Sequence, residues 1–243
     1  GVDYDMWLGP APLKPFNDNR FHYNFRFMWD YADGLMADWG VHLLDYAMEG
    51  MNADLPEYVY GAGGKYGYPN DAMETPDTLM VTYKYPDFNI IWDHACGVGN
   101  GLFDKREGVA FYGENGTLLL TRAGWEVFPE QSINSRSFPY CYPCDDERKP
   151  NTLRMDAVAH QKGSGKGLYL HAGNMLECMR SRKLPSADIA IGAKVAKLSH
   201  MGNISSRVGQ ALNWDNTTGT FDNVEANRLV KAVYRDPWKV PVI

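Results

Sequence analysis

The chain has 243 residues, with 24 lysine and arginine residues against 30 aspartate and glutamate residues, and its formal net charge is -6. Hydrophobic residues make up 44% of it and charged residues 22%. This composition excludes a disordered protein, because a disordered chain lacks the apolar surface needed to offset the entropy lost on ordering. The mild acidity excludes a broad positive surface for phosphates, so neither nucleic acid nor an anionic membrane is an expected partner.

No segment reaches the ~18 consecutive apolar residues that span a bilayer. The first residues have neither the basic region nor the apolar region of a signal peptide. Gly1 opens directly into a polar and aromatic segment, which suggests a piece of a longer protein. The compartment therefore stays undecided between cytoplasm and periplasm, because it would depend on a signal outside this chain.

The four cysteines, Cys96, Cys141, Cys144 and Cys178, are too few for a disulfide scaffold in a chain of this size. Cys141 and Cys144 have the C-x-x-C spacing of a redox pair or of half a zinc site. No second C-x-x-C or H-x-x-x-H completes the zinc ligands, and the pair lies in a polar, proline-containing segment that predicts a long loop near 130–151. We expect structural or incidental thiols there.

The N-terminal segment, 5–29, is rich in aromatic residues and proline without a clear period. It is therefore expected to be irregular chain that packs through its rings. A helix is predicted over 38–51, ended by Gly50 and a turn at 52–54.

From residue 57 onward, runs of β-branched and aromatic residues alternate with turn signals, which predicts strands. The expected strands span residues 57–62, 78–85, 89–95, 108–112, 117–121 and 125–128. Several of their connections are only a few residues long, and such short connections join only antiparallel neighbours. An antiparallel sheet is the consequence.

Helical periodicity returns after the long loop. Helices are expected over 169–182 and 188–212, and a last one begins at a capping box formed by Asp222 and Glu225. The whole predicts a single α+β domain over 1–243, in which helices pack on one face of an open, mostly antiparallel sheet.

Two glycine-rich stretches fail as nucleotide-binding motifs. Gly61–Gly67 lacks the last glycine of G-x-G-x-x-G, because Tyr66 occupies that position, and no N-terminal βαβ unit surrounds it. Gly163–Gly167 lacks the first glycine of a P-loop and the hydroxyl residue after its lysine. Both are expected to be flexible turns, so the chain alone is expected to hold no nucleotide cofactor.

A polar stripe on the helix predicted over 38–51 is the strongest local constellation. Asp38, His42, Asp45 and Glu49 recur at i, i+4, i+7 and i+11, which places them along one side of a helix that is otherwise mostly apolar. An imidazole one turn from a carboxylate has the groups for proton transfer near neutral pH. His42 is therefore the best candidate acid or base, and the alternative is a polar face whose histidine only hydrogen-bonds locally.

The same stripe offers ligands for a divalent metal. The usual helical ligand pair is two histidines with a glutamate, however, and this helix has one histidine. No metal site is expected.

Arg20, His22, Trp29 and Tyr31 precede this helix closely and are expected to fold over the same cleft. Aromatic faces with polar donors between them suit a sugar ring, which has apolar faces and hydroxyl edges. Packing of the irregular N-terminal segment explains these residues equally well. Of the remaining histidines, His94 is expected to be a satisfied sheet residue, and His160, His171 and His200 carry no constellation in the sequence.

The segment Asp38–Asp45 resembles the D-x-G-x-H-x-x-D signature in the C-terminal half of the Gfo/Idh/MocA oxidoreductases. Further segments carry the resemblance along the chain: 7–12, 20–24, 29–31, 111–118, 180–182, 213–215 and 235–238. The resemblance implies an open-sheet domain like the C-terminal domain of dihydrodipicolinate reductase. It also implies an N-terminal Rossmann domain that holds NAD or NADP and is absent from this chain.

By this resemblance, Asp38 and His42 act with a lysine on the hydroxyl of a sugar, glycoside or cyclitol. We expect His42 to take or return the proton of that hydroxyl and Asp38 to orient His42. Asp45 is expected at the substrate site as a supporting or structural partner. That lysine belongs to a Glu-Lys-Pro motif of the nucleotide domain, which does not occur here. The chain is thus expected to be the substrate half of an NAD(P)-dependent oxidoreductase, inactive alone, and a homo-oligomer through its sheet.

Three alternatives stay open. An NAD-dependent glycosidase would use transient oxidation and elimination to cleave its substrate. A non-catalytic carbohydrate-binding or assembly module would keep the fold without the reaction. A metal-dependent isomerase or lyase would use Asp38, His42 and Asp45 as ligands.

Overall fold

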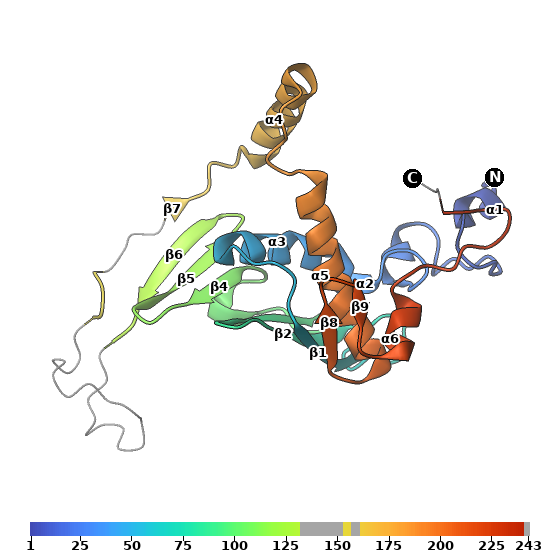
Figure 1. The fold of residues 1–243 in the computed structure, drawn as a ribbon, viewed down its shortest axis with the longest axis horizontal. Coiled ribbons are helices and arrows are strands. Elements are labelled where there is room, and N and C mark those ends of the chain that lie inside the picture. The colour runs from blue at the N-terminus through green and yellow to red at the C-terminus, as the bar shows by residue number, and fades with distance from the viewer. Residues whose placement is uncertain (132–152, 157–160, 241–243) are drawn as a thin grey trace. The chain divides into compact units, whose positions relative to one another are not determined.

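The structure is a computed structural model that describes residues 1–131, 153–156 and 161–240 (Figure 1). Most of the predicted long loop, together with Cys141, Cys144 and His160, lies outside these residues. The contacts between Cα atoms separate two units: the described residues of Gly1–Gly99 and Ile189–Ile243 form unit 1, and those of Asn100–Asp188 form unit 2. Each unit is considered by itself, and the single domain over 1–243 stays a prediction.

Unit 1 is built on an antiparallel sheet with the strand order β3-β2-β1-β8-β9. Its strands are β1 (Tyr58–Gly64), β2 (Thr78–Lys84), β3 (Asn89–Ala95), β8 (Leu212–Asp215) and β9 (Thr220–Phe221). Side chains alternate between the two faces of a strand, and Val59, Leu79, Val81, Tyr83 and Trp92 are buried on one of them. The long helix α5 (Ile189–Val208) packs against β1 (Figure 1).

The close approach of α5 to β1 explains the first glycine-rich stretch. A Cβ atom on Gly61 would lie 2.8 Å from the carbonyl oxygen of Gly202 in α5. The amide of Gly61 donates to Oγ of the buried Ser205 at 2.9 Å, and the hydroxyl of Tyr83 donates to the carbonyl of Leu198 at 2.8 Å. The prediction of a flexible turn was wrong at Gly61–Gly64, because these glycines lie in a strand and let a helix come close.

Most of the remaining helices of unit 1 precede β1 in the sequence. They are α1 (Tyr4–Leu8), the 3-10 helix η1 (Tyr23–Phe27), α2 (Gly34–Asp38), α3 (Gly40–Met51) and, near the other end, α6 (Val224–Leu229). Both α2 and α3 pack against α5. The helix predicted over 38–51 therefore begins later than expected, because Asp38 is the last residue of α2 and α3 begins at Gly40. It ends at Met51, and Asn52 caps it in the left-handed conformation.

The N-terminal segment packs through its rings, as predicted. Trp7 stacks on Tyr4 with the ring centroids 5.6 Å apart, and it also contacts Phe21 and Tyr31. Arg235, from the other end of the chain, donates to the carbonyl oxygen of Gly9 at 2.9 Å. The two ends of the described chain are therefore held together.

Unit 2 contains a second antiparallel sheet with the order β4-β5-β6-β7. Its elements are η2 (Leu102–Asp104), β4 (Val109–Tyr112), β5 (Gly116–Thr121), β6 (Gly124–Pro129), β7 (Gln161–Lys162) and α4 (Gly167–Ser181). The predicted antiparallel strands are thus confirmed, and the structure divides them between two sheets. No helix in the part of the chain that the structure describes is long and apolar enough to cross a membrane.

Two predictions near the C-terminus were wrong. The long helix expected over 188–212 ends at Val208, and Leu212 begins β8 beside β1. The cap of the last helix is Asn223, whose side chain accepts from the amide of Ala226 at 3.0 Å. Asp222 is not the cap, because its carboxylate binds the amide of Asn213 at 3.0 Å instead.

Candidate active site

A cleft of about 450 Å³ lies in unit 1, where α2 and α3 meet α5. Its lining residues combine a few apolar side chains with acidic, basic and hydroxyl groups. They are Phe25, Arg26, Tyr31, Ala32, Asp33, Ala37, Asp38, Val41, His42, Ala196, Ser199 and His200. The structure thus brings Tyr31, Asp38 and His42, three of the residues predicted from the sequence, into one cleft.

Asp38 and His42 enter this cleft from adjoining helices. His42 lies in the first turn of α3 and is exposed, and its ring meets that of Trp39 edge-on with the centroids 6.3 Å apart. The Asp38 carboxylate lies 3.6 Å from Nε of Arg26. The sequence predicts Asp38 as the partner of His42, whereas in the structure Asp38 pairs with the Arg26 guanidinium.

Arg26 is itself held by aromatic rings. Its guanidinium carbon lies 4.3 Å from the ring centroid of Tyr23 and 4.9 Å from that of Phe25. Cation–π contacts of this kind restrict a long side chain. The 3-10 helix η1 therefore positions a cation beside Asp38, which sequence reasoning missed.

His200 and Asp33 form a second polar pair in the cleft. Nδ1 of His200 lies 2.8 Å from Oδ2 of Asp33. The hydroxyl of Ser199, the neighbour of His200 on α5, is buried and has no hydrogen-bond partner. No sequence pattern predicts this pair, because Asp33 and His200 lie far apart in the chain and meet only through the packing of α2 on α5.

Tyr31 presents a second unpartnered hydroxyl to the same region. Its oxygen is buried without a hydrogen-bond partner, and the Tyr31 ring lies against Trp7 at 5.2 Å. Burial, followed by the nearby Tyr4, raises the pKa of Tyr31. Tyr31 is therefore a neutral hydroxyl donor at physiological pH.

Asp45 lies one turn beyond His42 on α3 and is not among the residues that line the cleft within the described chain. It is partly buried. Burial and the neighbouring Glu49 raise the pKa of the Asp45 carboxyl, while His42 lowers it. Asp45 therefore interacts electrostatically with His42 from outside the cleft. Its role as a partner of the substrate site stays a prediction.

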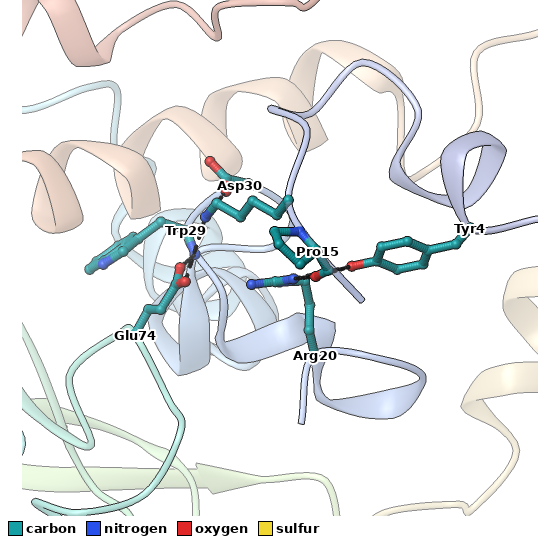
Figure 2. Close-up of polar contacts among 7 residues, drawn as sticks. Tyr4, Pro15, Arg20, Trp29, Asp30 and Glu74 are labelled. Atoms are coloured by element: carbon teal, nitrogen blue, oxygen red, sulfur yellow. Dashed lines mark hydrogen bonds and ion pairs between the residues drawn. The ribbon is translucent and has the colours of Figure 1, made fainter. Parts of the chain in front are cut away.

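The other three predicted binding residues lie outside the described lining of the cleft. Arg20 is buried and donates to the hydroxyl of Tyr4 at 3.1 Å and to the carbonyl of Pro15 at 3.0 Å (Figure 2). The amide of Trp29 donates to Glu74 at 3.1 Å (Figure 2).

The side chains of Trp29 and His22 are also engaged in ring contacts. The guanidinium of Arg207 lies 4.6 Å from the ring centroid of Trp29. His22 is exposed and contacts the ring of Phe21. The contacts of Arg20, Trp29 and His22 thus tie the N-terminal segment together, and their part in binding a sugar stays a prediction.

His94 is a satisfied sheet residue, as predicted. Its Nδ1 accepts from the indole of Trp92 at 2.8 Å, and its Nε2 lies 3.3 Å from the carbonyl oxygen of Pro76. Burial lowers the pKa of His94, although the Pro76 carbonyl and nearby carboxylates oppose it. Among the described residues, no group of three or more histidine, cysteine, aspartate or glutamate side chains is arranged to hold a metal ion.

The fit of this chain to a nucleotide cofactor can be tested at its glycines. Gly61 and Gly63, which come closest to the dinucleotide fingerprint, are used for packing, because a Cβ on either would meet the backbone of α5 or β2. They are therefore not available to cradle a pyrophosphate. This stretch therefore does not fit the pyrophosphate of NAD or NADP.

The fold is shared with known oxidoreductases. Levoglucosan dehydrogenase, in a complex with NADH and levoglucosan, is 13% identical, with a TM-score of 0.54 over 81% of this chain and 54% of that one. An NAD-binding protein from Listeria innocua is 17% identical, with a TM-score of 0.51 over 78% and 50%. An oxidoreductase domain protein from Kribbella flavida is 13% identical, with a TM-score of 0.51 over 77% and 53%.

This chain spans about half the length of each of these structures. No curated protein sequence matches it. A family model described as the C-terminal alpha/beta domain of the oxidoreductase family matches residues 1–94, which include α2 and α3 of the cleft. The resemblance to the C-terminal domain of the Gfo/Idh/MocA oxidoreductases, first indicated by the motif around His42, is thereby confirmed.

Proposed function

We propose that this chain is the substrate-binding domain of an NAD(P)-dependent oxidoreductase that acts on a hydroxyl group of a sugar, glycoside or cyclitol. One observation carries the proposal: Asp38 and His42 line the same cleft. The resemblance to the family supports the proposal, because it implies that these two residues act on the substrate hydroxyl. The cleft also holds the hydroxyls of Tyr31 and Ser199 without partners, which a polyhydroxylated ligand would satisfy.

In the proposed reaction, His42 removes the proton of the reacting hydroxyl as general base. The Asp38 carboxylate, held beside Arg26, lines the same cleft, and its negative charge favours the imidazolium that forms on His42. As the proton moves to His42, the carbon bearing the hydroxyl becomes a carbonyl carbon and loses its hydrogen as hydride. The nicotinamide, when bound, supplies the acceptor for this hydride.

We expect the nucleotide to bind outside this chain. Gly61 and Gly63 are used for packing, and the sequence has no Glu-Lys-Pro motif. The chain alone is therefore expected to be inactive and to need a Rossmann domain as its partner. A homo-oligomer through the sheet of unit 1 is also part of the proposal. It is supported by three large side chains that are exposed on its strands: Tyr60, Met80 and Ile91.

The test is a hydride-transfer assay of the longer protein that includes this chain, with NAD or NADP and a panel of levoglucosan, L-sorbose, D-glucose and myo-inositol. At least one compound should reduce the nicotinamide, and His42→Ala should slow that reaction by about 100-fold or more, the scale of a lost general base. His171→Ala is the matched control, because it removes an exposed histidine of unit 2. Normal hydride transfer by His42→Ala would refute the role of His42.

A further inference from the structure

The cleft contains a second histidine–carboxylate pair that the proposed reaction does not use. Nδ1 of His200 donates to Oδ2 of Asp33 at 2.8 Å, because a carboxylate can only accept. This contact fixes the ring orientation and leaves Nε2 as the second hydrogen-bonding atom. Among the described residues, none forms a hydrogen bond or ion pair with Nε2, and the side chain of His200 is 50% exposed.

Asp33 is held in place by its backbone. It has a φ of 57°, and its carbonyl oxygen accepts from the side-chain amide of Asn203 at 2.8 Å. Gly34 follows with a φ of 71°, and a Cβ there would collide with Thr75. Residues held in such sparsely populated conformations are concentrated at functional sites. The carboxylate that orients His200 is therefore itself fixed by its neighbours.

Ser199 gives an independent sign of a ligand beside this pair. It is fully buried, its Oγ has no hydrogen-bond partner, and it lines the same cleft. A buried hydroxyl without a partner costs free energy unless something outside the chain satisfies it. Together, α5 supplies one free imidazole nitrogen and one free hydroxyl to the cleft that His42 enters from α3.

We propose that His200, oriented by Asp33, binds a second hydroxyl group of the substrate, with Ser199 beside it, while His42 acts on the reacting hydroxyl. This assignment rests on the proposed function and narrows its substrate class to compounds with at least two hydroxyls on one ring. His200 is then a binding residue and Asp33 a positioning residue that acts through it.

The first experiment measures kcat and KM of the longer protein with the panel compound that it oxidises. His200→Gln should raise KM about tenfold, the effect of one hydrogen bond to a charged or oriented group, and should change kcat by less than about threefold. Asp33→Asn should also raise KM, by a smaller factor. Lys197→Gln, an exposed substitution on the same helix, is the matched control. An unchanged KM in His200→Gln would overturn the proposal.

The second experiment does not depend on turnover. The histidine ring signals of the chain are followed by NMR as levoglucosan, L-sorbose, D-glucose or myo-inositol is added. At least one compound should shift the signals of His42 and His200 with the same dissociation constant, and Asp33→Asn should weaken that binding. A shift of His42 without His200 would overturn the role of His200 and leave the proposed function standing. No shift at either histidine, with no turnover, would overturn both.

Discussion

Two polar clusters of unit 1 contrast in how fully their atoms are bonded. The first surrounds Asp77, which is 0% exposed and precedes β2. Its carboxylate accepts from the amides of Tyr66 at 2.9 Å, Gly67 at 3.1 Å and Tyr68 at 2.7 Å, and from the hydroxyl of Thr78 at 2.8 Å. Both carboxylate oxygens of this buried anion therefore accept hydrogen bonds, three of which hold the loop between β1 and β2.

The second cluster is the cleft, where bonding is incomplete. The hydroxyls of Tyr31 and Ser199 are buried and have no hydrogen-bond partner among the described residues, and the exposed ring of His42 meets that of Trp39. Fully bonded buried groups stabilise one conformation, whereas unbonded ones are costly for the free protein and available to a ligand. The Asp77 cluster therefore stabilises the fold, whereas the cleft keeps polar groups available to the ligand that we propose.

The largest expected effect is on stability at Asp77. Asp77→Ala should lower the free energy of unfolding by about 3–5 kcal/mol, because four part-buried donors lose their buried acceptor at once. Urea unfolding measures this change. Asp87→Ala, an exposed carboxylate in the turn between β2 and β3, is the control and should change stability by less than about 0.5 kcal/mol. A loss as small as that of the control would show that the loop is held by other contacts.

The same carboxylate should make stability depend on acid pH. Burial acts to raise the pKa of Asp77, but the donors from Tyr68, Gly67, Thr78 and Tyr66 outweigh it and lower the pKa to about 2 from 3.8. A folded-state pKa below the unfolded value contributes stability above the unfolded pKa, and that stability is lost as pH falls toward the folded one.

The corresponding loss between pH 4 and pH 2 is on the order of 2 kcal/mol. Urea midpoints across this range should fall in the wild type. The pH dependence should be smaller in Asp77→Asn, measured against its own value at neutral pH. An equal dependence in both proteins would mean that other carboxyl groups produce it.

The smallest effect separates two buried serines of α5. Ser205 bonds the amide of Gly61 and the carbonyl of Gln210, so Ser205→Ala should destabilise the protein by about 1 kcal/mol. Ser199 has no partner, so Ser199→Ala should leave stability unchanged or slightly raised while weakening binding of the sugar. Thermal unfolding and sugar titration of both variants check this. Equal destabilisation by both substitutions would show that Ser199, like Ser205, stabilises the fold.

Local patterns predicted most strands of this fold, since short turns between β2 and β3 and around β5 leave only antiparallel pairing. These local patterns were wrong where contacts between distant segments determine the secondary structure. Leu212 begins a strand because the edge of β1 is available to it, and the Gly61–Gly64 stretch is extended because α5 lies on it.

The candidate site shows the same limit. Asp38 and His42 could be predicted because they are four residues apart on successive helical turns. His200 and Asp33 could not, because only the packing of α5 on α2 brings them together. The hydrogen bonds of Arg20 to Tyr4 and Pro15 could not be predicted either, because they depend on how the irregular N-terminal segment folds, and binding of the substrate by Arg20 stays a prediction.

The most direct test of the central claim is rescue of the missing base. Hydride transfer by the longer protein is measured for the wild type, for His42→Ala and for His42→Ala with added imidazole. A base supplied by His42 predicts a loss of about 100-fold or more in the variant and partial recovery with imidazole, which has the same reacting nitrogen. Hydride transfer within threefold of the wild type, or a loss that imidazole leaves unchanged while substrate binding is intact, would contradict the assignment of this cleft as the proton-transfer site.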